Sequence, residues 1–444
     1  MTARTVPRLS PGEVARFAAD PFTGMLDALR KHGPVVGVGY GSQRSTFFFG
    51  PQANSFVFAN PELFSWRESF EVMLPVLGQT ALLVTDGEEH RRRRHLVLPA
   101  FHRRRIDGYV ELMAANTVAT IGRWTPGTRI DLYRELRSLI RRNTIETLYG
   151  SRLAAQNDAI GARLQTALDA TDLPLGLQLF LTGIPNPITA RAKRARRWVA
   201  ERVQGEIDHR RRHAVEGRDG LTALLEPAAE GTCPLDDSEI QDQVISLMVA
   251  GYETTSAAMA WVVHSALSTP GVWERARVEV RDVLGTDENS VDALDKLDYV
   301  DGVVQEALRL HPPVVVLPRV TAGELEFEGV RLAPGARLAI SPYVTHRMAG
   351  VWPEPDRFLP ERWQPDHPLH RPATPSTYLP FGGGRHRCIG APFATAELKT
   401  VLVELLRRTE LTPAGEVTPV SIMAMRPRRG VPVIVRRRKA EGEQ

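Results

Sequence analysis

The chain has 444 residues, 43% of them hydrophobic, and a formal net charge of +4. This length and composition are sufficient for a large buried core. Only two cysteines are present, which excludes a small disulfide-stapled scaffold and indicates a reducing compartment. We therefore expect a cytoplasmic protein.

The sequence gives no indication of membrane attachment. The segment from Met1 to Asp20 lacks the apolar run of a signal peptide. Stretches 173–190 and 254–273 carry no charged residue, but both contain proline, and neither is typical of a membrane span. We expect a soluble monomer with no membrane span.

Basic residues, nearly all arginine, are concentrated in short runs. Solvated helix faces are the simplest interpretation, and a docking surface for an acidic protein partner is the alternative. Nucleic acid is not expected, since the chain has no zinc-finger spacing and no basic tract interleaved with aromatic residues. The runs are residues 90–95, 102–105, 191–197, 209–213 and 436–439.

The segment from Met1 to Asn60 is expected to mix short strands with turns, and most of the chain from Pro61 to Arg408 is expected to be helical. The clearest helix begins after Asp236, which forms a capping-box pattern with Glu239, and continues to about Ser268. A helix of this length spans roughly 50 Å. Because its second half is largely apolar, we expect it to cross the middle of the molecule.

Shorter elements follow in chain order. A helix is predicted over 299–310, before His311-Pro312-Pro313, and another over 391–408. The predicted strands are residues 35–39, 45–49, 314–320, 325–327 and 337–340.

These elements predict a mainly α fold with small β-sheets. We expect one domain over residues 1–444, with a β-rich part at about 21–60 and 314–345 and a helical remainder.

Cys388 lies in a glycine-rich loop directly before the last predicted helix. The glycines Gly382 to Gly384 and Gly390 allow backbone N–H groups to approach a sulfur closely. The start of the following helix favours the thiolate over the thiol. This context indicates a metal ligand and not an inert buried cysteine.

The pattern Phe381-x-x-Gly384-x-His386-x-Cys388-x-Gly390 resembles the haem-binding signature of the cytochrome P450 family. The resemblance implies haem b, with Cys388 as the thiolate ligand of the iron, Phe381 shielding the sulfur and His386 contacting a propionate. Gly390 belongs to the same cofactor-binding loop. The implied fold holds the haem between the long central helix and the helix after the loop.

Other motifs match the family in the expected order. Glu306 and Arg309, three residues apart on one helix, are implied to form a buried charge network with Arg362 of a downstream Pro-Glu-Arg segment. His90 and Arg94 are implied to bind the propionates, and Arg91 to Arg93, at other helical phases, are expected to be solvated or to face a partner. Arg319 is implied as a further propionate ligand.

The long helix carries Ala250-Gly251-Tyr252-Glu253-Thr254. An acid beside a hydroxyl is locally unfavourable within a helix, which suggests a functional pair. Gly251 is expected to permit a π-type bulge that holds O2 and water. The resemblance implies that Thr254 hydrogen-bonds oxygen or water beside the haem and that Glu253 relays protons.

The resemblance also locates substrate contacts, which are mainly aliphatic here and predict a small lipophilic substrate: a fatty acid, terpenoid, steroid or polyketide. The apolar stretch 173–190 is a candidate lid. The candidate pocket residues are Phe70, Met248, Ala250, Val315, Ile422 and Met423.

The sequence therefore predicts a haem-thiolate monooxygenase of the soluble bacterial type. No flavin or iron–sulfur module is visible, so we expect electrons from a separate ferredoxin or flavodoxin with an NAD(P)H-dependent reductase. A peroxide-driven hydroxylase or a haem-thiolate isomerase is an alternative. A haem-based sensor or ligand-sequestering protein is an alternative from another class.

Overall fold

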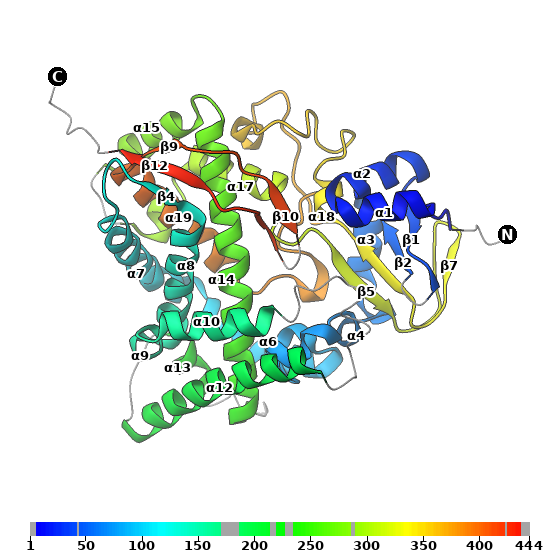
Figure 1. The fold of residues 1–444 in the computed structure, drawn as a ribbon, viewed down its shortest axis with the longest axis horizontal. Helices are drawn as coiled ribbons and strands as arrows, with labels where there is room; N and C mark the ends of the chain where they lie inside the picture. Colours follow the sequence, from blue (N-terminus) through cyan, green and yellow to red (C-terminus); the bar gives the residue numbers. More distant parts are fainter. Residues whose placement is uncertain are drawn as a thin grey trace.

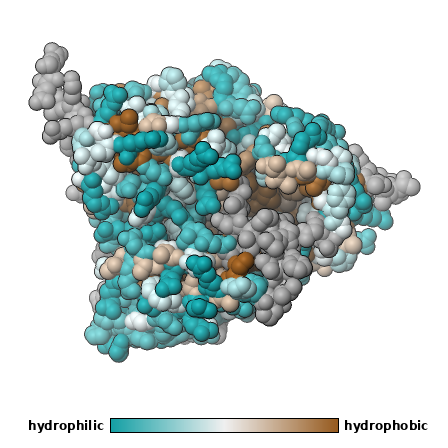
Figure 2. All heavy atoms as spheres, viewed as in Figure 1, coloured by the Kyte–Doolittle hydropathy of each residue, from teal (hydrophilic) through white to brown (hydrophobic). Residues whose placement is uncertain are grey.

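The computed structural model describes residues 6–41, 44–169, 186–213, 219–226, 234–285, 289–421 and 424–436. Helices dominate, and a smaller β-rich part lies beside them (Figure 1). The predicted class, mainly α with small β-sheets, is confirmed. Figure 2 shows a largely hydrophilic face, with apolar side chains in the hollow between the two parts.

The largest sheet joins two distant stretches of the chain, with the strand order β1-β2-β8-β5-β3. β2 and β8 run parallel, whereas the other neighbours are antiparallel. Most of the predicted strands are present nearly as expected. The strands of this sheet are β1 (Val35–Val38), β2 (Ser45–Phe48), β3 (Phe64–Ser65), β5 (Leu317–Thr321) and β8 (Arg337–Ile340).

The expectation of strands and turns alone between Met1 and Asn60 is wrong. This region contains α1 (Pro11–Ala19), α2 (Pro21–His32) and α3 (Pro51–Ala59). Each helix has proline in its first turn, where no backbone N–H is required. Ser10 and Asp20 cap α1 and α2 through their side chains, so local capping determines these helices.

The long central helix is α14 (Asp237–Ser268), which has 32 residues. Asp236 is its N-cap and forms the expected capping box with Glu239. It packs against α8 (Leu132–Tyr149), α12 (Pro187–His213) and α19 (Ala391–Arg408). Figure 1 shows α14 passing through the middle of the molecule, as predicted.

The main hydrophobic core surrounds α14, and two smaller clusters lie in the β-rich part. Within the described ranges, no helix has the length and apolarity needed to cross a membrane. The other helices are α4 (Trp66–Ser69), α5 (Leu74–Leu77), α6 (Gly87–Val97), α7 (Arg103–Ile121), α9 (Ser151–Ala154), α10 (Asn157–Leu168), α13 (Gly220–Leu225), α15 (Val272–Leu284), α16 (Val291–Leu294), α17 (Asp298–Leu310) and α18 (Pro342–Thr345). The other strands are β4 (Arg129–Asp131), β6 (Leu325–Phe327), β7 (Val330–Leu332), β9 (Glu410–Pro413), β10 (Pro419–Ser421), β11 (Met425–Pro427) and β12 (Pro432–Arg436).

Candidate functional site

The cysteine loop has a tightly determined backbone. Gly382 and Gly384 both have a φ of 65°, in the left-handed region that favours glycine. A Cβ on Gly384 would lie 2.8 Å from the carbonyl oxygen of Phe58. The amide of Cys388 donates to the carbonyl oxygen of Phe381 at 2.9 Å, which closes the loop.

The Cys388 thiol faces a hollow inside the molecule. Its side chain is accessible to solvent, yet burial raises its pKa because protein surrounds it on most sides. A hydrogen bond from the backbone of Gly390 and the charges of Arg94 and Arg387 act in the opposite direction and favour the thiolate. An accessible sulfur in an interior hollow, with groups that stabilise its anion, suits a thiolate ligand of a bound metal.

One face of α14 is open, although most of this helix is buried. Ala250 is exposed, and Leu247, Gly251 and Thr254 are partly exposed. These positions are three or four residues apart, so they share one helix face. α14 packs against α19, which begins directly after the cysteine loop, so the helix with the open face and the loop with Cys388 belong to neighbouring parts of the fold.

The expected π-type bulge is not present, since α14 is α-helical throughout. A Cβ on Gly251 would lie 3.1 Å from Thr144 Cγ2, so this glycine allows close packing of α14 on α8. The Thr254 hydroxyl donates to the carbonyl oxygen of Ala250 at 2.7 Å. Its oxygen can still accept a hydrogen bond from a molecule at the open face.

Glu253 does not point to the open face. Its carboxylate is buried and forms an ion pair with Arg137 of α8. Arg137 also donates to Gln165 of α10, so one guanidinium connects three helices. Burial disfavours the charge on Arg137, but Glu253 outweighs this effect and raises its pKa. Glu253 is therefore held as a paired carboxylate beside the Thr254 turn.

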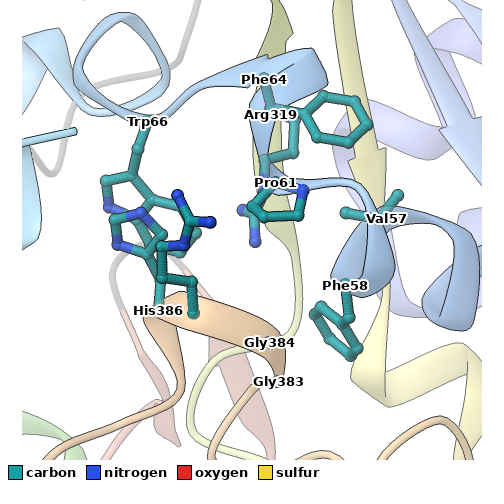
Figure 3. Close-up of a pocket in the computed structure, with 10 residues that line it drawn as sticks. Val57, Phe58, Pro61, Phe64, Trp66, Arg319, Gly383, Gly384 and His386 are labelled. Atoms are coloured by element: carbon teal, nitrogen blue, oxygen red, sulfur yellow. The ribbon is translucent and has the colours of Figure 1, made fainter. Parts of the chain in front are cut away.

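A stack of flat side chains lies at the edge of the cysteine loop. The His386 ring is 3.9 Å from the Trp66 ring, at 5° between planes, and 3.9 Å from the His90 ring. The Arg319 guanidinium lies 4.0 Å from the Trp66 centroid. Figure 3 shows Trp66 and His386 overlapping on one side of a pocket, with Phe58 on the other. We call Trp66, His90, Arg319 and His386 the stacked cluster.

The stacked cluster contains no carboxylate of its own. The nearest one, Asp86, accepts from the backbone amide of Trp66 at 2.9 Å and acts on Arg319 and His90 only through its charge. Burial lowers the pKa of His90 to about 4, of His386 to about 2 and of Arg319 to about 9. Trp66 Nε1 and His90 Nδ1 are buried and have no hydrogen-bond partner among the described residues. Arg319 donates to the carbonyl oxygen of Pro318 at 2.6 Å. A buried guanidinium without an ion-pair partner, beside ring nitrogens that lack hydrogen-bond partners, fits the two carboxylates of haem.

The structure also brings Glu306, Arg309 and Arg362 together. The Glu306 carboxylate accepts from Nε of Arg309 and from Nε of Arg362, both at 2.9 Å, and all three side chains are 0% exposed. The amide of Leu359 and the indole of Trp363 also donate to this carboxylate. The remaining guanidinium donors bond to backbone carbonyls, so the network is satisfied by protein.

The candidate pocket residues have different environments. Ala250 lies on the open face of α14, and Phe70 is partly buried against the Trp66 ring. Met248 is turned away from that face, since it is 1% exposed and packs in the main core. Val315 is buried in a small cluster of the β-rich part. Ile422 and Met423 lie outside the described residues, as does most of the 173–190 stretch.

The expectation for Arg91 to Arg93 is partly wrong. Arg93 is 7% exposed and donates to Glu239 through Nε at 3.0 Å. Arg92 also pairs with Glu239, whereas Arg91 is exposed beside Glu88. Several other basic runs form ion pairs within the chain too. These arginines pair with acidic residues on distant helices. The position of a residue around its own helix does not show such contacts, so the sequence prediction missed them.

Sequence reasoning missed Trp66 and Arg137. Trp66 follows a short strand and carries no motif, and its contacts with Arg319 and His386 come from distant parts of the chain. Arg137 lies in a helix with several other arginines and has no distinguishing spacing. Only the tertiary structure identifies these two residues as part of the site.

Comparisons with known proteins agree with this geometry. A family model described as Cytochrome P450 matches residues 13–434. Putative cytochrome P450 139 of Mycobacterium tuberculosis is 40% identical over 417 residues, which cover 93% of this chain and 97% of that protein. The cyclooctat-9-en-7-ol 5-monooxygenase of Streptomyces melanosporofaciens is 33% identical over 399 residues, covering 88% of this chain and 86% of that protein.

The fold also matches a solved structure, the retinoic acid-bound cyanobacterial CYP120A1. The TM-score is 0.87 at 26% identity, and the match covers 98% of this chain and 100% of the other. The haem cofactor and oxygen-incorporating chemistry expected from the sequence are therefore confirmed at the level of the family. The chain belongs to the cytochrome P450 family and is a haem-dependent monooxygenase.

Proposed function

We propose that this enzyme inserts one oxygen atom of O2 into a lipophilic, terpenoid-like substrate at the open face of α14. The observation that carries the proposal is the accessible stripe of Leu247, Ala250 and Thr254, with Gly251, in the otherwise buried middle part of α14. An apolar surface with a single hydroxyl suits a hydrocarbon substrate and leaves Thr254 to handle oxygen or water.

Cys388 holds the iron, and Arg94, His90, His386, Arg319 and Trp66 hold the propionates in this proposal. Bound haem supplies O2 activation. Thr254 can accept a hydrogen bond while it donates to Ala250, so it can position a polar species without breaking its own contact. Glu253, one residue earlier, moves protons when Arg137 releases its carboxylate.

A terpenoid-like substrate agrees with what is known of two relatives. One is named for the oxidation of cyclooctat-9-en-7-ol, and the structural neighbour was solved with retinoic acid bound. Both molecules are largely hydrocarbon and carry few polar groups. Among fatty acids, terpenoids, steroids and polyketides, a terpenoid is therefore the first class to test.

Electrons come from a separate ferredoxin or flavodoxin and its NAD(P)H-dependent reductase in the cytoplasm, under this proposal. Arg385 and Arg387 of the cysteine loop and His95 of α6 are exposed. Positive charge near the cysteine would attract an acidic carrier and speed its association at low salt.

The test is a binding and turnover screen. Purified holoenzyme is titrated with a terpenoid, fatty-acid and steroid library, and compounds that shift the haem to high spin are incubated with a surrogate ferredoxin, its reductase and labelled O2. We expect one labelled oxygen atom per product molecule. Turnover with peroxide but with no electron-transfer pair would support the peroxide-driven alternative, and binding without any product would support a sensor.

A further inference from the structure

Asp242 of α14 connects parts of the molecule that are far apart in sequence. Its side chain is buried, at 3% exposure. Its carboxylate accepts from the amide of Thr80 at 2.9 Å and from the Thr80 hydroxyl at 2.8 Å. The other carboxylate oxygen is paired with Arg196 of α12. One carboxylate thus fastens both the 78–82 loop and α12 to the central helix.

The 78–82 loop is shaped around this carboxylate. A Cβ on Gly78 would lie 2.1 Å from Asp242 Oδ1, and Gly78 has a φ of 98°. The neighbouring Gln243 adds two bonds, accepting from the amide of Leu82 at 2.9 Å and donating to the carbonyl oxygen of Thr80 at 2.6 Å. The loop therefore approaches α14 through polar contacts that need an acceptor at position 242.

This loop ends a segment, residues 66–82, that we assign to the rim of the proposed pocket. The segment begins at Trp66 in the stacked cluster and continues through Phe70 to α5. α5 contacts α10, α12 and α14, and its last turn leads directly into Gly78. Asp242 lies two helical turns before the open face at Ala250. Asp242 therefore fastens this segment to α14 from outside the open face.

The chemistry of the contact favours a latch over simple packing. Hydrogen bonds to a buried carboxylate are stronger than neutral ones, and they depend on the charge. The two arms are separable, since Thr80 holds the loop and Arg196 holds α12. Arg196 is 24% exposed in its side chain, so this arm borders solvent and can be released.

We propose that Asp242 is a positioning residue that latches the rim of the haem pocket, and that it sets how fast ligands enter and leave. This inference rests on the proposed function in one respect, the location of the pocket beside the open face of α14. A latch raises the free-energy barrier that a ligand crosses on its way into and out of the pocket. Its loss therefore accelerates binding and release together and leaves the affinity nearly unchanged.

The test uses holoenzyme and 4-phenylimidazole, a bulky azole that gives a spectral signal on binding haem. In Asp242→Asn, stopped-flow association and dissociation rate constants should both rise about tenfold, the factor for losing one hydrogen bond to a charged group. The dissociation constant should change by no more than about twofold. Two variants weaken one arm each: Arg196→Gln removes the contact with α12, and Thr80→Val removes the hydroxyl bond of the loop but keeps its amide bond. Both should move the two rates in the same direction by less.

The matched control is Asp237→Asn. Asp237 forms an exposed ion pair with Arg211, which also joins α14 to α12 but does not reach the 78–82 loop. This variant should keep wild-type rates.

Hydrogen exchange of the amides of residues 78–82 provides a readout that is independent of the haem. Exchange should be faster in Asp242→Asn and unchanged in the control. The proposal would be overturned if Asp242→Asn had the same hydrogen exchange and the same azole rate constants as the wild type. It would also be overturned if only the dissociation rate constant changed, so that the affinity changed with it. If Asp242→Asn does not fold, the two single-arm variants decide by the same criteria. If hydrogen exchange is faster in Asp242→Asn but the azole binds to no variant, the role of Asp242 in holding the loop stands and the pocket assignment is contradicted.

Discussion

The network around Glu306 and the stacked cluster are both buried, and they differ in how their polar groups are satisfied. In the network of Glu306, Arg309 and Arg362, the carboxylate and both guanidinium groups bond to protein atoms. In the stacked cluster, Trp66 Nε1 and His90 Nδ1 have no partner within the part of the chain that the structure describes. The first cluster contains its own anion, whereas the second contains one cation, Arg319, and three neutral rings.

The difference separates a structural role from a binding role. Burying unpaired charge is costly, so a satisfied network is stable by itself and holds the fold. An unsatisfied cluster is stabilised only when a ligand supplies the missing acceptors. The haem propionates have the charge and the acceptor atoms that the stacked cluster lacks.

Glu306→Gln should produce the largest effect. It leaves two buried guanidinium groups without their carboxylate, so the free energy of unfolding should fall by about 3–5 kcal/mol. Chemical denaturation of the apoprotein and the holoprotein measures this loss, which should appear in both forms. Glu354→Gln, at an exposed ion pair with Arg357, is the control and should change stability little. Equal effects of the two substitutions would remove the distinction between the clusters.

Arg319→Leu should have opposite effects on the apoprotein and on the haem-bound protein. Without haem, removal of a buried unpaired guanidinium should leave the apoprotein as stable as the wild type or more stable. With haem, the loss of a charged hydrogen bond should weaken cofactor binding by roughly 10- to 100-fold. Haem transfer to an acceptor protein measures the affinity. A substitution that destabilised both forms equally would place Arg319 with the structural network.

Glu397 provides a third case, a buried carboxyl of α19. Its oxygens make no hydrogen bond of ordinary geometry to any described residue, and Asn143 is its polar neighbour. Burial raises its pKa from 4.5 to about 8, so the folded protein keeps this proton at neutral pH. Between these pH values the unfolded chain ionises and the folded chain does not, so stability should fall as pH rises through this window.

Glu397→Gln should therefore flatten the dependence of stability on pH between about 5 and 8. Denaturation curves at several pH values give the comparison, and the variant should gain relative to wild type as pH rises. Glu410→Gln, at an exposed carboxylate of β9, is the control. Parallel curves for wild type and Glu397→Gln would mean that this carboxyl is ionised in the fold.

Trp66→Phe should have the smallest effect. Phenylalanine keeps a ring between Arg319 and His386 but removes the unpartnered N–H. Loss of one hydrogen bond from a neutral donor to a propionate should cost about 1.5 kcal/mol, or about a tenfold faster haem dissociation. The stability of the apoprotein should not change. An unchanged dissociation rate would mean that the indole only packs in the stack.

Local signals predicted much of the fold. The capping box of Asp236 and Glu239 indicated the start of α14, and the helix at Ala391–Arg408 was predicted with its observed ends. The helices between Met1 and Asn60 were missed, although proline and the capping residues Ser10 and Asp20 were visible in the sequence. These helices lie on either side of the two β-rich runs, which form β1 and β2 as predicted.

The site was predicted only where a motif exists. Cys388 and the Glu306 network follow from linear patterns, whereas Trp66 and Arg137 depend on contacts between distant segments. Met248 shows the limit of a pattern within one helix. It lies two residues before Ala250, and this offset places its side chain in the core instead of on the open face. Helical phase relative to other elements is determined by packing, which the sequence does not display.

The central claim is that Cys388 binds haem iron through its thiolate while the stacked cluster binds the propionates. The carbon monoxide difference spectrum of the reduced protein tests it most directly. We predict the strongly red-shifted band of thiolate-ligated haem in the wild type and in Trp66→Phe, and its loss in Cys388→Ala. A band typical of histidine-ligated haem in the freshly purified wild-type protein would contradict the account.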